Sequence, residues 1–350
     1  MQATYKRYIL DFKRPSGTSR GILRQKETWF LILREGKKIG IGECGLFRGL
    51  SMDDVPDYEQ KLQWTCANIS LGKERLWNEL VKFPSIQFGL EQAFISLTSK
   101  NPFHLFSSAF VEEQGPIPIN GLVWMGDRQF MHDQIQQKLA EGFSCIKMKI
   151  GALDFDKEIA LLNSIRKEYS KDEIELRVDA NGAFAPDEAF EKLTILSSYQ
   201  LHSIEQPIKQ GNTQKMKELC DKTTLPIALD EELIGVYNVT EKEELLQTIR
   251  PQYIILKPSL VGGYRGAEEW IALAEKYDVG WWITSALESN IGLNAIAQWT
   301  ATKNSSMRQG LGTGGLFSNN FEGPLTVESG SLYYINDKNW KTNLIQDLCI

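Results

Sequence analysis

The stretch SCIKMKIGALDFDKEIALLNSIRKEYSKDEIELRVDANG, residues 144–182, contains two short apolar runs with an amphipathic segment between them. The runs at 144–150 and 174–178 have the length of buried strands. The segment 154–169 has the length of a helix, and Asp154 stands where a helix N-terminus favours an acidic side chain. A strand, a helix and a second strand in this order predict a βαβ unit with parallel strands.

The same unit repeats between residues 116 and 322, where short apolar runs recur about every 25 residues with helical segments between them. The seven clearest runs are 117–123, 144–150, 174–178, 201–204, 227–229, 253–256 and 280–284, and an eighth is possible at 308–312. This repetition predicts an α/β fold, a (β/α)7–8 barrel of the TIM type. A doubly wound open sheet alternates strands and helices in the same way and stays as the alternative.

The chain on either side of this repeat has a different pattern. Up to residue 115, strand-like alternation is mixed with helical segments at 53–69 and 88–98, which predicts a small α+β unit. The last segment, 323–350, returns to strand-like sequence and is expected to pack back on that first unit. We therefore expect three parts: an α+β unit at 1–115, a barrel at 116–322 and a returning segment.

The composition excludes several classes of protein. The 350 residues include 39 Lys and Arg against 45 Asp and Glu, so there is no basic surplus for a nucleic-acid partner. Five scattered cysteines without a Cys-x-x-Cys pair encode neither a disulfide framework nor a thiolate zinc site. The sequence has no signal peptide and no apolar stretch of about 18 residues, so we expect a cytoplasmic protein without a membrane partner.

The signatures of common hydrolases and P-loop enzymes, H-E-x-x-H, G-x-S-x-G and G-x-x-x-x-G-K-[ST], are absent. The three histidines, His104, His132 and His202, are far apart in the chain and are interpreted as structural. A formal G-x-G-x-x-G match at 310–315 follows no apolar strand, so it favours a tight turn near a substrate anion over a dinucleotide site. Acid–base chemistry is therefore expected from carboxylates and lysines.

Charged residues lie at or just past the end of five successive apolar runs, 25 to 30 residues apart. They are Lys147 and Lys149, then Asp179, Glu205, Asp230 and Lys257. Each has a simpler explanation when taken alone, such as a helix cap, a turn or a solvated lysine pair. In a barrel, however, the carboxyl ends of the strands meet on the face that carries active sites. All six together therefore predict one catalytic rim.

Three carboxylates at one level need a counter-charge, because like charges oppose ionisation in a partly buried site. Oxygen ligands without Cys or His favour Mg²⁺, with Mn²⁺ as a substitute. The second and sixth strands of an eight-stranded ring lie opposite each other, so Lys149 and Lys257 are expected to flank the metal. This arrangement predicts proton abstraction next to the carboxylate of a small-molecule substrate, with the charge of the enolate stabilised by the metal and a lysine. Lys149 is expected to act as the base, with Lys147 beside it.

The segments K-x-K, V-D-A-N-G, I-E-Q-P, A-L-D-E and L-K-P-S-L-V-G-G, in this order, resemble the muconate-lactonizing subgroup of the enolase superfamily over nearly the whole chain. That superfamily pairs a Lys or His base with Mg²⁺. The resemblance implies that the first α+β unit is a capping domain, whose loops near 16–21 and 45–51 close over the barrel mouth.

The resemblance also implies a role for each charged residue. Asp179, Glu205 and Asp230 would be the Mg²⁺ ligands, although Glu231 and Glu232 adjoin the third of them. Lys149 would be the acid–base lysine, Lys147 its partner near the substrate carboxylate, and Lys257 the lysine across the site.

Two further segments, S-A-L-E-S-N-I-G at 285–292 and G-L-G-T-G-G-L-F at 310–317, are most similar to the dehydratase of menaquinone synthesis within this subgroup. The similarity implies a lyase that removes water from 2-succinyl-6-hydroxy-2,4-cyclohexadiene-1-carboxylate by syn elimination, with Lys149 moving the proton. The residues implied for holding the succinyl tail are Ser285, Ser289, Gly312, Thr313 and Gly314.

Two alternatives remain at this point. An N-acylamino acid racemase or dipeptide epimerase of the same subgroup would need the same lysines, but dipeptide epimerases are expected to carry an Asp-x-Asp where this chain has Gly312-Thr-Gly-Gly315. A barrel without activity, used as a binding scaffold, would have to bury unpaired charges without a function to offset the cost. The sequence predicts no particular oligomeric state.

Overall fold

A seven-stranded parallel sheet lies at the centre of the described residues of the computed structural model, which are 1–18, 21–151 and 153–348. The strands are ordered β11-β10-β9-β8-β7-β6-β5. They are β5 (Gly121–Val123), β6 (Cys145–Lys149), β7 (Glu175–Asp179), β8 (Ser203–Glu205), β9 (Ile227–Leu229), β10 (Tyr253–Leu256) and β11 (Gly280–Ile283). The predicted α/β barrel is therefore confirmed.

The predicted eighth run is not a full strand. Two parallel bridges occupy its place, Ile119 with Gln309 and Thr284 with Gly310. They join the segment before β5 to the segment after β11, so Gln309 and Gly310 close the curled sheet into a barrel. The first predicted run, 117–123, is likewise divided, because its start forms β4 (Ile117–Pro118) in a different sheet and only its end forms β5.

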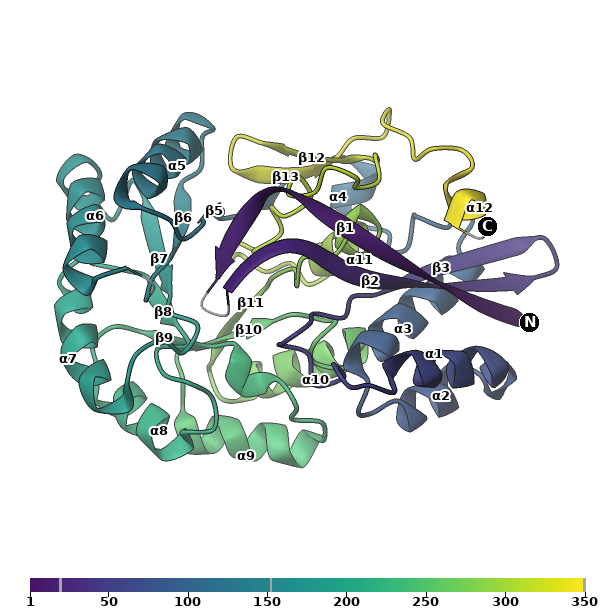
Figure 1. Cartoon of the computed structure of the whole chain (residues 1–350), viewed down its shortest axis with the longest axis horizontal. Helices are drawn as coiled ribbons and strands as arrows, with labels where there is room; N and C mark the ends of the chain where they lie inside the picture. The colour runs from purple at the N-terminus through teal and green to yellow at the C-terminus, as the bar shows by residue number, and fades with distance from the viewer. Residues whose placement is uncertain (19–20, 152, 349–350) are drawn as a thin grey trace.

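Helices form the outer layer and follow the strands in sequence (Figure 1). They are α5 (Arg128–Ala140), α6 (Phe155–Glu168), α7 (Pro186–Ser197), α8 (Thr213–Lys222), α9 (Val239–Ile249), α10 (Gly263–Lys276) and α11 (Asn290–Ala301). The strand β6 shows why the layers separate: Ile146 and Met148 pack in the core that includes helix residues such as Leu161. Successive side chains on a strand point to opposite faces. Lys147 and Lys149 therefore point to the inside of the barrel.

The N-terminal unit is an antiparallel sheet of β1 (Gln2–Thr18), β2 (Gly21–Glu35) and β3 (Lys38–Cys44), with four helices after it. The helices are α1 (Tyr58–Ala67), α2 (Lys73–Glu79), α3 (Pro84–Thr98) and α4 (Ala109–Glu112). A Cβ added to Gly42 of β3 would lie 1.8 Å from the carbonyl oxygen of Gly89 in α3, so only glycine allows this close approach. Residues 53–57 of the predicted helix 53–69 lie before α1, and residues 69–71 form a separate 3-10 turn.

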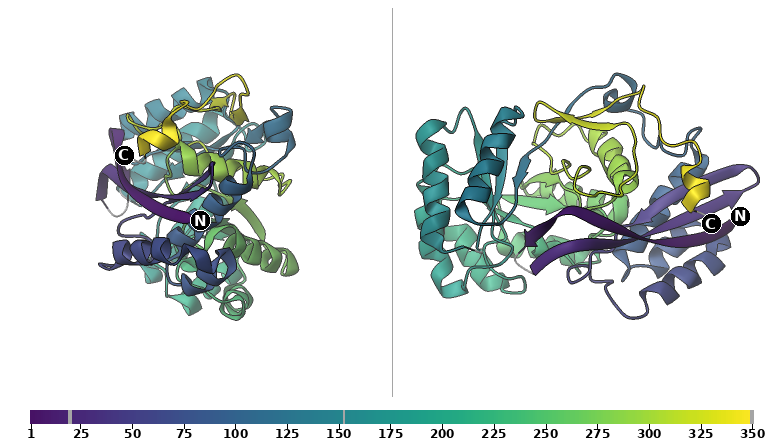
Figure 2. Two further views of the ribbon diagram at one scale, coloured as in Figure 1. Left: turned by 90° about the vertical axis from the view of Figure 1, so that its right-hand side faces the viewer. Right: turned by 45° about the horizontal axis from the view of Figure 1, so that its top comes forward.

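The C-terminal segment divides between the two units. Its strands β12 (Leu325–Glu328) and β13 (Ser331–Tyr334) form a small sheet with β4 and are not part of the N-terminal sheet. The last helix, α12 (Leu344–Leu348), does reach that sheet and packs near Phe30 and Ile41. In Figure 2, α12 lies beside the N-terminal unit. The boundaries at 115 and 322 stay a prediction.

The hairpin of β1 and β2 extends from the N-terminal sheet across to the barrel side (Figures 1 and 2). The loop predicted at 16–21 overlaps the end of β1 and the start of β2, and its residues 19–20 lie outside the described residues. None of the described helices is long and apolar enough to cross a bilayer.

Trp282 provides a test of the barrel interior, where its buried ring contacts Ala228 and Ile255 and lies 4.3 Å from the guanidinium carbon of Arg177. We expect Trp282→Ala to lower the free energy of unfolding by about 3–5 kcal/mol, because it leaves a cavity in a closed core. Urea denaturation measures this. The control Phe190→Ala removes a ring that is 46% exposed on α7 and should cost less than about 0.5 kcal/mol. Equal losses in the two variants would contradict this description of the interior.

Candidate active site

The carboxyl ends of successive barrel strands bring the six predicted charged residues together. Lys149 of β6 is paired in register with Asp179 of β7, and Asp179 with Glu205 of β8. Parallel strands in register place these three side chains at one level of the barrel. Asp230 and Lys257 directly follow β9 and β10, at the same end of the sheet.

The acids and lysines form a continuous set of buried ion pairs. The Lys147 ammonium lies 2.8 Å from Asp179 Oδ2 and also contacts Glu205. Lys149 Nζ donates to the same Asp179 oxygen at 2.5 Å, and Lys257 pairs with Asp230. The side chains of the three acids are at most 3% exposed. Each acid therefore has an ammonium neighbour that offsets the cost of its burial.

The pKa shifts show how closely these groups are placed. Burial raises the pKa of the Glu205 carboxyl, and the nearby carboxylates of Asp179 and Asp230 raise it further. Burial also tends to raise the pKa of Asp179, but Lys147 and Lys149 outweigh it and hold that pKa below its usual value. Burial tends to lower the pKa of Lys257, and the charge of Asp230 and other carboxylates raises it overall. The rim is thus one coupled electrostatic unit.

Asn181 is a member of this set that the sequence did not single out. Its Oδ1 accepts a hydrogen bond from Lys149 Nζ at 2.7 Å, and its Nδ2 donates to Glu231 Oε1 at 3.0 Å. Its backbone is left-handed, with φ of 45°, and its amide donates to Asp179 Oδ1 at 3.0 Å. The Asp-Ala-Asn-Gly turn was the available signal, because Asn tolerates this conformation.

The three acids that follow β9 have different partners. Asp230 pairs with Lys257, whereas Glu231 accepts from Asn181. Glu232 accepts from Gln206 Nε2 and from the Gly211 amide, both at 3.0 Å. Of the three, Glu232 therefore stabilises the loop after β8 through these hydrogen bonds.

A hard divalent cation such as Mg²⁺ needs several oxygen ligands around one point. Within the described residues, no three His, Cys, Asp or Glu side chains converge as metal ligands, and the lysine ammoniums instead contact the acids. Glu205 Oε1, however, is a buried carboxylate oxygen without a hydrogen-bond partner among those residues. An all-oxygen set with an unpartnered anionic oxygen fits a hard cation such as Mg²⁺.

A cavity of about 560 Å³ opens above these residues. Lys147, Lys149, Asn181 and Lys257 form part of its wall, and the three acids that contact these lysines are buried and do not line it. The N-terminal unit supplies further wall residues, namely Lys13, Arg14, Pro15, Ser16, Phe47 and Leu50. The loops predicted near 16–21 and 45–51 thus contribute wall residues to the cavity above the rim.

Comparisons with known proteins agree with this geometry. Residues 131–337 match the family described as enolase C-terminal domain-like. The o-succinylbenzoate synthase of Desulfotalea psychrophila is 46% identical over 363 aligned residues, covering 95% of this chain and 98% of the relative. The chain belongs to the o-succinylbenzoate synthase family of the enolase superfamily. This result confirms the resemblance found in the sequence.

The structural comparisons agree with the assignment to this family. The crystal structure of MenC from Desulfotalea psychrophila matches with a TM-score of 0.85 and 42% identity, over 95% of this chain and 99% of that one. The muconate lactonizing enzyme from Pseudomonas fluorescens matches with a TM-score of 0.82 at 21% identity, which shows the fold alone. The L-Ala-D/L-Glu epimerase of Bacillus subtilis is 32% identical over 172 residues, or 49% of this chain and 46% of the relative. The o-succinylbenzoate synthase family is therefore favoured over the epimerases.

The five residues predicted to hold a substrate tail divide into two groups. Ser285, Gly312 and Thr313 line the cavity, and Thr313 Oγ1 is buried without a partner among the described residues. Ser289 and Gly314 are not among the residues that line it. The hydroxyl of Ser289 instead donates to Glu43 Oε2 of β3 at 2.5 Å, which fixes the start of α11.

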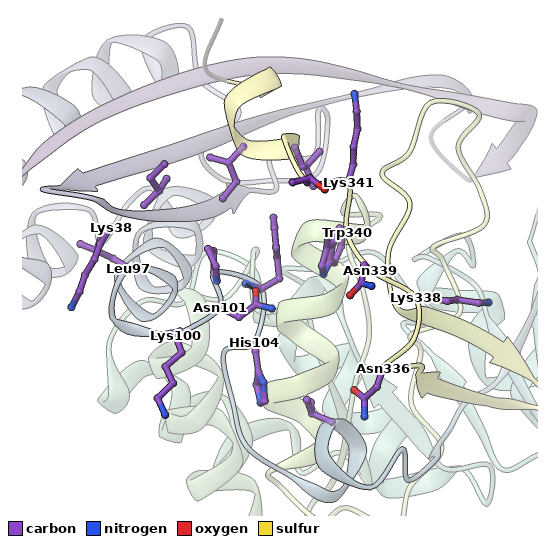
Figure 3. A pocket seen from close by; sticks show the side chains of 18 of the residues that line it. Lys38, Leu97, Lys100, Asn101, His104, Asn336, Lys338, Asn339, Trp340 and Lys341 are labelled. Atoms are coloured by element: carbon purple, nitrogen blue, oxygen red, sulfur yellow. Dashed lines mark hydrogen bonds between the residues drawn. The ribbon is translucent and has the colours of Figure 1, made fainter.

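A second cavity of about 700 Å³ lies away from the rim, between the N-terminal unit and the C-terminal segment. Its lysines, such as Lys38, Lys100 and Lys338, point in different directions and do not converge (Figure 3). Trp340 stacks on Phe103 there, with ring centroids 4.6 Å apart. This cavity brings together no group of residues suited to the predicted chemistry.

A second polar layer lies inside the barrel, below the rim. Arg177, two residues before Asp179, donates to Glu175 Oε1 at 2.7 Å, and Arg308 donates to Glu175 Oε2 at 2.9 Å. His202 stacks on Tyr253 with ring centroids 4.8 Å apart. Burial, together with the charge of Arg177, lowers the pKa of His202 to about 4.

A histidine titration followed by NMR tests this layer. We expect the His202 signal to titrate near pH 4, well below its usual value of 6.5. The unfolded chain binds a proton that the folded chain excludes between these values, so stability falls as the pH drops from 6.5 towards 4. The variant His202→Gln assigns the signal by removing it. A titration midpoint near 6.5 would show that the imidazole is not held in this environment.

Proposed function

We propose that this chain is an o-succinylbenzoate synthase, a lyase that dehydrates 2-succinyl-6-hydroxy-2,4-cyclohexadiene-1-carboxylate to 2-succinylbenzoate. The observation that carries the proposal is the position of two amines, Lys149 at the end of β6 and Lys257 directly after β10, at the wall of one cavity. Three buried acids lie at the same rim. In the closed barrel, these strands are four positions apart and so lie on opposite sides. The full-length similarity to a synthase of this name supports the same activity.

The proton follows a short path in this proposal. Lys149, as a free amine, takes the proton from the ring carbon that bears the carboxylate. It returns that proton to the hydroxyl leaving from the same face, so that the C–H and C–O bonds break, the aromatic ring forms and water departs. Asn181 and Asp179 orient the Lys149 amine through their hydrogen bonds. Lys257, across the cavity, stabilises the negative charge that develops on the substrate carboxylate.

Asp179, Glu205 and Asp230 would hold Mg²⁺, or Mn²⁺ in its place. When bound, the cation supplies positive charge to the substrate carboxylate as its neighbouring carbon loses the proton. The chain supports this role through three buried carboxylates and the unpartnered oxygen of Glu205. Lys147 contacts two of these acids and would turn its charge towards the substrate carboxylate when the cation neutralises them.

The remaining parts of the proposal concern the substrate tail and the cellular context. Thr313, with its unpartnered hydroxyl, is the strongest candidate to hold the succinyl tail, with Gly312 and Ser285 beside it on the cavity wall. The unit at 1–115 would act as a cap that shields the reaction from water. We place the reaction in menaquinone (vitamin K2) biosynthesis in the cytoplasm, with a small-molecule carboxylate as the partner.

The roles of the two lysines can be tested by following aromatisation of the cyclohexadiene substrate by absorbance with Mg²⁺ present. We expect Lys149→Ala and Lys257→Ala each to lower kcat at least about 10³-fold, because one removes the proton carrier and the other a charge that stabilises the transition state. Lys192→Ala, on the outer helix α7, is the matched control and should keep wild-type turnover. Turnover near wild type in either test variant would disprove its assigned role. Racemisation of an N-acylamino acid without dehydration would favour the racemase alternative.

The metal ligands can be tested by calorimetric titration of Mg²⁺ into the metal-free protein. We expect one site, and Asp179→Asn, Glu205→Gln and Asp230→Asn should each weaken it at least about tenfold by removing an anionic ligand. Glu232→Gln is the matched control, because its carboxylate is committed to Gln206 and Gly211. If Glu231→Gln weakens binding and Asp230→Asn does not, the third ligand is assigned wrongly. Absence of a Mg²⁺ site in the wild type would favour the scaffold alternative.

A further inference from the structure

Glu91 of α3 is a buried carboxylate from the N-terminal unit that contacts the start of the barrel helix α10. Its side chain is 7% exposed, Oε2 accepts from the Tyr264 amide at 2.6 Å and Oε1 accepts from the Arg265 amide at 3.3 Å. The first amides of a helix have no partner within it, and the helix dipole favours negative charge there. A residue of one unit thus caps a helix of the other.

The backbone before α10 is shaped to receive this carboxylate. Gly262 and Gly263 are both left-handed, with φ of 97° and 73°. A Cβ added to Gly263 would lie 2.1 Å from Glu91 Oε2, so only glycine lets the chain approach this closely. The side chain that follows, Tyr264, is held between Phe88 and Phe106, with centroid distances of 5.3 Å to each ring.

A tight turn connects this contact to Lys257. The amide of Gly263 donates to Pro258 O at 2.8 Å, and the amide of Leu260 donates to Lys257 O at 2.8 Å. Ser259 Oγ donates to Glu288 Oε1 at 2.5 Å, which fixes the middle of the turn. The hydrogen bonds of this turn therefore connect the backbone of Lys257 to the start of α10, where Glu91 accepts from the amides.

Replacing Glu91 would leave the first amides of α10 without this acceptor. Burial raises the pKa of the Glu91 carboxyl to about 7, although hydrogen bonds from the Tyr264 and Arg265 amides offset part of this rise. The residue before the helix is Gly262, which has no side chain to replace these bonds.

We infer that Glu91 is a positioning residue for Lys257, holding the turn 257–263 so that the lysine amine points into the cavity. The inference rests on the proposed function for the role of Lys257. It gives the N-terminal unit a part in the reaction besides covering the cavity, since one of its helices fixes a group on the barrel rim.

Three variants test this inference at a temperature well below their unfolding midpoints. Glu91→Ala should lower kcat at least about tenfold with a KM change below about threefold, because Lys257 acts mainly on charge that develops in the transition state. Glu91→Gln, which keeps one acceptor oxygen, should recover part of the loss. The matched control is Ser96→Ala on the same helix, which removes bonds to the Ile41 amide and Pro102 O but does not touch α10. Its kcat should stay within about twofold of wild type.

Amide hydrogen exchange by mass spectrometry gives a readout that needs no turnover. Exchange in the peptide 257–264 should increase at least about tenfold in Glu91→Ala and remain unchanged in Ser96→Ala. Unchanged exchange there, or an active Glu91→Ala with the wild-type kcat, overturns the inference. If Glu91→Ala does not fold, kcat and amide exchange are measured in Glu91→Gln instead. Failure of the wild-type protein to turn over substrate overturns the proposed function instead, and the exchange result then decides whether Glu91 holds the turn.

Discussion

Burial of opposite charges at one rim of the barrel is the constraint on which the rest of the structure depends. An isolated carboxylate loses several kcal/mol when it leaves water, and three of them at one level would repel each other as well. Asp179, Glu205 and Asp230 are tolerated because lysines from β6 and β10 contact them. The parallel strands provide the register that brings these residues to one level.

The N-terminal unit and the barrel depend on each other through buried carboxylates. Glu91 caps α10, and Glu43 of β3 accepts from the Ser289 amide at 2.9 Å and the Gly292 amide at 2.8 Å at the start of α11. Both helices follow strands whose ends face the cavity. Contacts that attach the N-terminal unit to the barrel therefore also shape the loops after β10 and β11.

The sequence predicted the barrel strands and the charged rim well, because both depend on local pattern and on regular spacing. Asp179, Glu205 and Lys257 could be placed together from their positions at strand ends alone. The place of the eighth run, 308–312, was predicted, but its reduction to bridges at Gln309 and Gly310 was not, since two residues give no strand pattern. Ser289 was expected at the substrate because its segment resembles the family at 285–292, but its partner, Glu43, lies 246 residues away in the chain. Such long-range hydrogen bonds leave no local signal.

The most direct test of this account is the position of Mn²⁺ located by anomalous X-ray scattering in crystals of the protein with the product 2-succinylbenzoate. We expect one ion bound by Asp179, Glu205 and Asp230, with the product ring between the amines of Lys149 and Lys257. An ion held by other residues, or both amines on the same side of the ring, would contradict it.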